Sequence, residues 1–190
     1  MEALTPPPPR WTRRWLLSLL AAAGLARGQG RPGEQVALPD QVKAAYIYNF
    51  GNFVDWPDGV FPASDSPLQI GVVEADGLAQ QLAHAVAGRT VRGRSVAVRT
   101  LRPRDPTAGV QMLVIGKLAP PQLGEVLVAA RGQPVLLVTE AEGALARGSM
   151  INFVMADQRL RFEIAAKTAE QSGLTISARL LAAALRVEGR

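Results

Sequence analysis

The sequence predicts an α/β fold with a single domain: a mainly parallel sheet with helices on both faces, followed by a C-terminal antiparallel hairpin and a terminal helix. Two observations lead to this prediction. Short β-branched runs alternate with helix-like patterns through the middle of the chain, and two apolar runs joined by a short polar turn follow them. The 190 residues, of which 48% are hydrophobic and 19% charged, suffice for one globular core.

The first predicted element is a helix over residues 41–54. Pro39 and Asp40 form a start signal, because the Asp40 carboxylate can accept hydrogen bonds from the free amides of the first turn. Trp56-Pro57 marks the end, because proline disfavours the helical conformation in the residue before it. Side chains three and four positions apart form the predicted apolar face: Val42, Ala45, Tyr46, Asn49, Phe50 and Phe53.

Apolar runs and turn residues predict the remaining elements in chain order. Strands are expected at residues 68–73, 95–101, 110–115 and 134–138, with helices at 78–86 and 122–130. The antiparallel hairpin, expected at a sheet edge, comprises residues 150–155 and 160–164. A short helix at 167–172 and a last helix capped by Ser177, with Leu180, Leu181, Ala184 and Leu185 on one side, complete the domain.

The N-terminal segment has the layout of a secretory signal peptide. Residues 15–25 form an apolar run behind several arginines, and this run is shorter than the roughly 20 residues of a membrane span. The boundaries predicted are a cleaved signal at 1–26, a flexible lead-in at 27–39 and the domain at 40–187. Arg13-Arg14 fits either twin-arginine export or the general route. Both routes lead to the periplasm, with no transmembrane span in the mature chain.

Composition argues against several kinds of chemistry. The chain has no cysteine, so a thiol nucleophile and a thiolate metal site are excluded, and its single histidine, His84, is expected on the solvent side of a helix. No metal, cofactor or catalytic residue is predicted. Residues 1–26 contain three arginines and one glutamate, so their loss changes the formal charge from +5 to +3, too small an excess to indicate nucleic-acid binding.

Aromatic residues indicate a contact surface. Eight aromatics lie beyond residue 26, and six of them fall between Tyr46 and Phe61. Ile47 and Tyr48 point away from the predicted apolar face of the first helix, so this helix is either covered on two sides by its own chain or meets another protein. The residues predicted to contact a partner or a second copy of the chain are Tyr48, Asn52 and Trp56.

Six arginines between residues 89 and 104 surround the predicted strand at 95–101. They allow two interpretations: a basic stripe that docks an acidic partner, or a solvated edge strand whose charges prevent aggregation. The first interpretation makes Arg92, Arg94 and Arg99 secondary electrostatic contacts.

The turn after the first strand, Glu74-Ala75-Asp76-Gly77, is the alternative ligand site. In parallel α/β sheets, ligands bind beyond the carboxyl ends of the strands, where this turn lies. Its single glycine and two carboxylates argue against phosphate binding there. Glu74 and Asp76 are therefore candidates for contacts with some other small molecule.

Several motifs share one family resemblance. The first helix carries Lys43-Ala44-Ala45-Tyr46-Ile47-Tyr48-Asn49-Phe50, followed by Phe53 and Trp56-Pro57. Further motifs follow in order: Ile70-Gly71-Val72, Leu113-Val114-Ile115, Val138-Thr139-Glu140, Ile151-Asn152-Phe153, Arg159 to Ile164, and Gly173-Leu174-Thr175-Ile176-Ser177 with Leu180-Leu181. Together they resemble the YfiR family over residues 40–187. Many relatives have a cysteine where this chain has Val110, and commonly an asparagine where it has Ala165, so disulfide control known in relatives cannot operate here.

The resemblance implies a periplasmic negative regulator. Such a protein binds the periplasmic domain of an inner-membrane diguanylate cyclase or sensor kinase and restrains cyclic di-GMP synthesis, and some members are dimers. We therefore expect a binding protein, not an enzyme. The alternatives are a periplasmic small-molecule-binding protein and, less favoured, an envelope hydrolase.

Overall fold

The computed structural model describes residues 39–189, and the expected signal peptide lies outside these residues. An eight-stranded sheet has the order β10-β8-β7-β6-β5-β2-β4-β3, and β1 pairs with β9 in a second, two-stranded sheet. The helices are α1 (Pro39–Phe53), α2 (Asp76–Val86), α3 (Pro120–Ala129), α4 (Ala166–Gln171) and α5 (Ala178–Ala183), with a 3₁₀ turn at Leu145–Arg147. The strands are β1 (Val54–Asp55), β2 (Leu68–Val73), β3 (Thr90–Val91), β4 (Arg94–Leu101), β5 (Met112–Ile115), β6 (Leu136–Thr139), β7 (Ile151–Ala156), β8 (Arg159–Ala165), β9 (Thr175–Ile176) and β10 (Arg186–Glu188).

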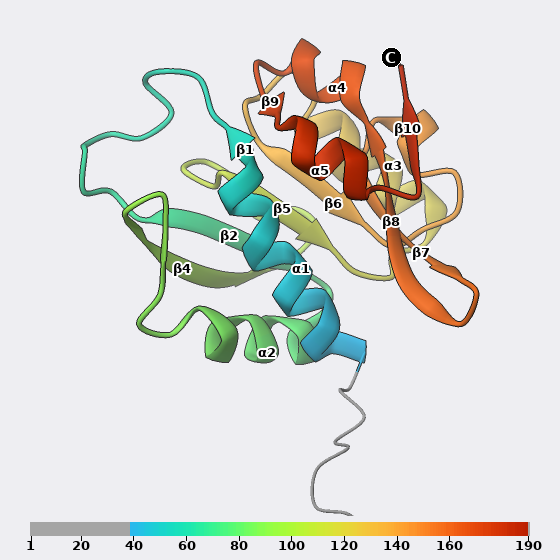
Figure 1. Cartoon of the computed structure of the whole chain (residues 1–190), viewed down its shortest axis with the longest axis horizontal. Helices are drawn as coiled ribbons and strands as arrows, with labels where there is room; N and C mark the ends of the chain where they lie inside the picture. The colour runs from blue at the N-terminus through green and yellow to red at the C-terminus, as the bar shows by residue number, and fades with distance from the viewer. Residues whose placement is uncertain (1–38, 190) are drawn as a thin grey trace, which may run out of the picture. The chain divides into compact units, whose positions relative to one another are not determined.

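The predicted α/β class and mainly parallel sheet are confirmed. Strands β4, β2, β5, β6 and β7 are parallel, whereas β7 and β8 form the predicted antiparallel hairpin. Figure 1 shows α1 and α5 in front of the sheet and α3 behind it. Because β4 and β5 lie on opposite sides of β2, the carboxyl ends of β2 and β5 diverge into loops that leave a crevice.

The first helix is rotated relative to the prediction. Ala45 and Asn49 are exposed, whereas Ala44, Ile47 and Phe50 are buried. The reason is that α1 packs against α2 as well as the sheet, so its buried face is wider and shifted. Ile47 is fully buried by its own chain, which decides between the two alternatives for this residue.

The end of the chain also differs from the prediction. The last helix ends at Ala183, and the following residues form β10, which pairs in parallel with β8. The prediction that the hairpin forms the sheet edge is therefore wrong along Glu163–Ala165, where β10 covers β8. The predicted helix cap is confirmed, because Ser177 Oγ accepts a hydrogen bond from the Leu180 amide at 3.4 Å.

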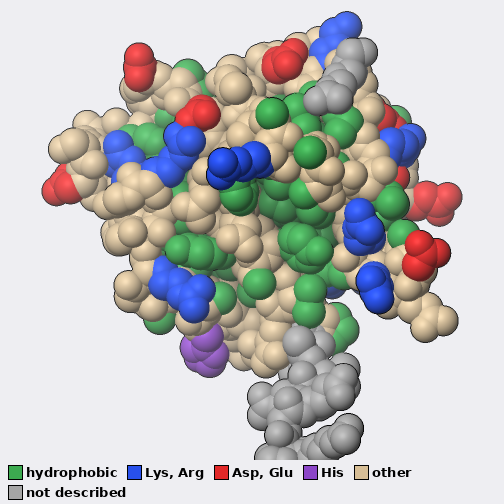
Figure 2. Space-filling model, viewed as in Figure 1, with side chains coloured by type: hydrophobic (Ala, Val, Ile, Leu, Met, Phe, Trp, Pro, Cys, Tyr) green, Lys and Arg blue, Asp and Glu red, His purple; other side chains and the backbone are tan. Residues whose placement is uncertain are grey.

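The core is apolar and surrounds the central strands. Every residue of β5 and β6 is buried, because helices cover both sheet faces. In front of the sheet, Phe50 packs between Tyr46, Phe153 and Phe162, with ring centroids 5.1–6.2 Å apart. Figure 2 shows this face, with hydrophobic side chains nearer its centre and Asp and Glu side chains towards its outline.

Candidate functional site

The predicted contact residues of α1 lie beside the β3–β4 hairpin. Tyr48 is half-buried, and its hydroxyl donates a 3.0 Å hydrogen bond to the carbonyl oxygen of Thr90. The Arg89 guanidinium lies 5.5 Å from the centre of the Tyr48 ring. The Asn52 amide donates back to the carbonyl oxygen of Tyr48 at 3.4 Å. Tyr48 therefore ties α1 to the hairpin and presents only part of its ring to solvent.

Trp56 forms one wall of a surface cavity of about 290 Å³. Its indole Nε1 donates a 3.0 Å hydrogen bond to the carbonyl oxygen of Gln111, and the ring meets Phe61 edge-on with centroids 6.3 Å apart. Arg92 and Arg94 line the same cavity. The structure thus brings together three of the six predicted contact residues, and we call the set of Tyr48, Trp56, Phe61, Arg92 and Arg94 the aromatic–arginine surface.

The arginines of this region have different roles. Arg94 is half-buried, stacks over Phe61 at 4.0 Å, and donates from Nη1 to three carbonyl oxygens of the loop between β1 and β2: those of Ala63, Ser64 and Ser66, at 2.8–3.0 Å. Arg92 forms an ion pair with Asp55. Arg94 therefore stabilises the loop that carries Phe61, and Arg92 fastens the hairpin to β1.

Arg99 is different, because it is exposed and no ion pair or side-chain hydrogen bond within residues 39–189 engages it. It lies on β4, whose outer edge pairs with β3 only at Arg94 and Ser95. The outer edge of β4 at residues 96–101 therefore has no strand partner in the described part of the chain, which is compatible with both interpretations of the arginines, and Arg99 is free to contact another molecule.

The predicted ligand loop opens onto a second cavity, of about 260 Å³, at the carboxyl ends of β2, β5 and β6. Glu74 lines it in a left-handed backbone conformation, with φ of 51°. Asp76 is exposed at the first position of α2 and is not among the described residues that line this cavity. The structure thus supports Glu74, and not Asp76, as a residue of the crevice.

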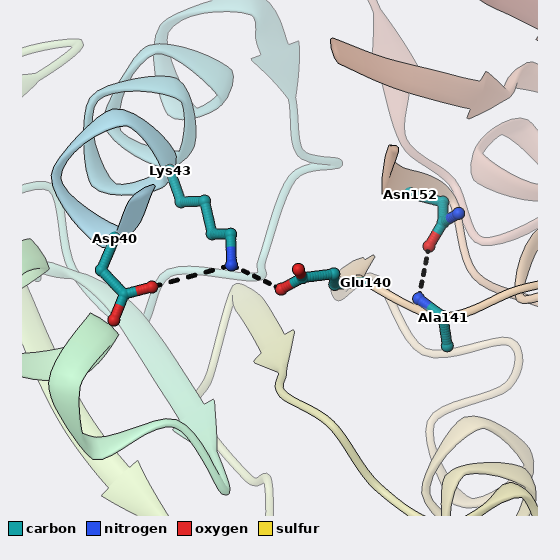
Figure 3. Close-up of polar contacts among 5 residues, drawn as sticks. All are labelled: Asp40, Lys43, Glu140, Ala141 and Asn152. Carbon is teal, nitrogen blue, oxygen red and sulfur yellow. Dashed lines mark hydrogen bonds and ion pairs between the residues drawn. The ribbon is translucent and has the colours of Figure 1, made fainter. Parts of the chain in front are cut away.

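A buried lysine, Lys43, is among the residues that line this cavity. Figure 3 shows its side chain pointing between the carboxylates of Asp40 and Glu140. Lys43 is 9% exposed, and its ammonium lies 2.6 Å from a carboxylate oxygen of Glu140 and 3.7 Å from one of Asp40. Next to Glu140, the Asn152 carboxamide oxygen accepts hydrogen bonds from the Ala141 amide at 3.1 Å and from the Thr139 hydroxyl at 2.8 Å. These bonds fix the loop that positions Glu140.

Comparison with known families gives one decisive match: the model of the YfiR/HmsC-like family matches residues 40–184. The chain belongs to that family. A comparison with curated proteins gave no match. Among solved structures, a conserved domain protein from Vibrio cholerae O1 biovar El Tor is similar, with 15% sequence identity and a TM-score of 0.55. The match covers 79% of this chain but only 60% of the Vibrio chain, and at this identity it shows the fold alone.

YfiR/HmsC-like proteins are periplasmic and regulate signalling, so this family is regulatory rather than catalytic. The described residues add two findings. No helix within 39–189 is long and apolar enough to cross a membrane. His84 is exposed on α2, as expected, and no group of His, Asp and Glu in the described part of the chain has the arrangement of a metal site.

Sequence reasoning missed Lys43 and Glu140 as site residues. A signal was present, because Lys43 stands four residues before Ile47 and seven before Phe50, on the buried side of α1. A lysine on a buried helix face needs a carboxylate partner to avoid the cost of desolvating its charge. The identity of that partner, 97 residues away, was not readable from spacing.

Proposed function

We propose that this protein is an exported regulator that binds the periplasmic sensor domain of a membrane signalling protein and represses it. The target is a diguanylate cyclase, so binding lowers cyclic di-GMP synthesis, and residues 1–26 direct export to the periplasm. Membership of the YfiR/HmsC-like family over residues 40–184 carries this proposal. Repression requires that the protein bind the inactive state of the sensor domain more tightly than the active state.

The aromatic–arginine surface is the proposed docking site. Aromatic side chains that are half-buried beforehand lose little conformational freedom on binding, which makes Trp56 and Phe61 suitable anchors. Arg99 lies five residues beyond Arg94 on β4 and points to the opposite face of the sheet, because side chains alternate along a strand, so it supplies a separate electrostatic contact to an acidic partner. Arg92 and Arg94 contribute indirectly: their side chains hold the β3–β4 hairpin and the β1–β2 loop in place, and so maintain the shape of the docking surface.

The test is site-specific photo-crosslinking in cells. A benzophenone amino acid is placed at Asp58, which is exposed and lines the same cavity as Trp56, and in a matched control at Val128, which is 62% exposed on α3. We expect a cross-link from position 58 to a membrane protein with a periplasmic domain, and none from position 128. Equal cross-linking from both positions, or none from either, contradicts docking at this surface.

The regulatory outcome has its own readout. Deletion of the gene is expected to raise the cellular level of cyclic di-GMP. Expression of the wild-type chain in the deletion strain should lower this level to its original value. The Arg99→Glu variant should lower the cyclic di-GMP level only slightly. The Arg131→Glu variant, a charge reversal at an exposed position after α3, should lower it as far as the wild-type chain does. Full restoration by a chain without residues 1–26 would contradict action in the periplasm.

A second candidate function is binding of a small molecule in the crevice beside Glu74. The observation that favours it is the cavity of about 260 Å³ at the position where α/β sheets commonly bind ligands. A metabolite that raises the melting temperature of the wild-type protein, but not of Glu74→Gln, would support it. No stabilising metabolite in a broad panel would argue against it.

A further inference from the structure

A further cavity lies between the N-terminal half of α1, the β7–β8 hairpin and α5, and it shares Lys43 and Glu140 with the crevice. Its volume is about 680 Å³, within the usual range of sites for small organic molecules. We propose that this cavity binds an amphiphilic organic anion, with an apolar body and a carboxylate or sulfonate head. The inference is independent of the docking function proposed above.

The walls of the cavity are apolar and aromatic. Tyr46 and Phe162, whose rings lie 5.5 Å apart, form its inner side, and Leu160 lies on the same strand as Phe162. Figure 2 shows hydrophobic side chains gathered between α1 and the hairpin. An apolar ligand body therefore gains hydrophobic burial here, in proportion to the area it covers.

The charge around the cavity favours an anion. Glu140 is the one carboxylate among its described lining residues, and the Lys43 ammonium 2.6 Å away already neutralises it. Arg159 and Arg161, on the hairpin strand β8, also line the cavity, and no ion pair within residues 39–189 engages either guanidinium. Two unpaired guanidinium groups beside an apolar wall match the head of an anionic amphiphile.

The Tyr46 hydroxyl supplies an additional donor, since no hydrogen bond within the described part of the chain engages it. The arginines cannot be explained as partners of acidic neighbours, unlike Arg186, which is held by Glu163 at 3.1 Å. Nor does β10 cover this part of β8, because its pairing starts at Glu163. The hairpin end of β8 thus leaves its basic side chains next to an open cavity.

The test compares two probes of equal chain length and opposite charge, dodecanoate and dodecyltrimethylammonium, each below its critical micelle concentration. Isothermal titration calorimetry should show binding of dodecanoate to the purified protein and much weaker binding of the cation. Equal affinity for the two probes, or no binding of dodecanoate, overturns the proposal.

Variants locate the site. Arg159→Glu with Arg161→Glu should weaken dodecanoate binding by about tenfold or more, because two charge-assisted contacts become repulsive. The matched control, Arg102→Glu with Arg104→Glu, changes the net charge equally at exposed positions away from the cavity and should leave the affinity unchanged. Ala183→Trp, at an exposed position in the cavity wall, should block binding while the unliganded melting temperature is retained. Wild-type affinity in the hairpin double variant overturns the proposal.

Discussion

Arg94 is predicted to be a structural residue of the loop between β1 and β2 and not a partner contact. Replacing it with alanine removes a guanidinium that donates to three loop carbonyl oxygens and stacks over Phe61. Nη1 carries two hydrogens, so at most two of these three bonds reach full strength. The lost interactions hold the loop that forms one side of the aromatic–arginine surface.

The magnitude follows from the exposure of the loop. A hydrogen bond from a charged group contributes about 1.5–3 kcal/mol, and exposed carbonyl oxygens regain water when it is lost, so the lower value applies to the pair of bonds together. The cation–π contact with Phe61 adds about 0.5–1 kcal/mol. Arg94→Ala should therefore lower the free energy of unfolding by about 2 kcal/mol, which corresponds to a fall of about 4–8 °C in melting temperature for a domain of this size.

Two measurements check this prediction. Urea denaturation followed by circular dichroism gives the change in unfolding free energy, and hydrogen exchange should show faster exchange confined to residues 57–67. The control is Arg99→Ala, which removes an exposed, unpaired arginine of the same strand and should change stability by no more than about 0.5 kcal/mol. If Arg94→Ala is as stable as Arg99→Ala, or if exchange in the loop is unchanged, the structural role assigned to Arg94 is refuted.

Two further changes test the packing around the sites. Gly116→Ala would place a Cβ 2.9 Å from the Ala75 Cβ and against the carbonyl of Glu74, so it should destabilise the fold by about 1–3 kcal/mol. The control is Gly124→Ala on α3, where a Cβ would meet no atom within 4 Å, so this change should be neutral or stabilising. Chemical denaturation compares the two, and equal stabilities would show that the crevice is not rigid. Phe50→Ala should lower the free energy of unfolding by about 3–5 kcal/mol, because Phe50 is fully buried among three aromatic rings. A decrease below about 1 kcal/mol, measured by calorimetry, would contradict this prediction.

The central strands were predictable because they are continuous apolar runs whose burial on both sheet faces requires no information from distant residues. Residues 68–73 were placed correctly to the residue, and β5, β6 and the hairpin within two residues. The sequence indicated a polar segment, residues 156–159, between the two strands, and the structure narrows the turn to Asp157 and Gln158, whose φ values of 48° and 58° are those of a tight two-residue turn.

The short elements were not predictable, because pairing partners create them. β10 begins two residues after the end of α5 and has three residues, and it is a strand only because β8 offers an open edge beside it. Likewise, β1 and β9 have two residues each and exist as a pair. Propensity over such lengths is too weak to decide a structure without its tertiary neighbours.

The contact residues show the same limit. Of the six residues that aromatic and basic composition pointed to, Trp56, Arg92 and Arg94 line one cavity, and a contact role for them stays a prediction. Composition did not distinguish arginines that hold the chain together from an arginine that is free. That distinction depends on carbonyl groups of a loop 28–31 residues away in sequence, which Arg94 reaches only after folding.

Helix α1 connects the three sites and limits how they can influence one another. Its N-terminal half contributes Lys43 and Tyr46 to the two cavities, and the docking surface begins at Tyr48, about 8 Å from Lys43 along the helix axis. On the inner side of the same helix, Ile47 and Phe50 are fully buried, so a close-packed core resists movement of the helix. A ligand in either cavity can therefore change partner binding only by displacing α1 as a rigid body, and it must bind one position of that helix more tightly than the other.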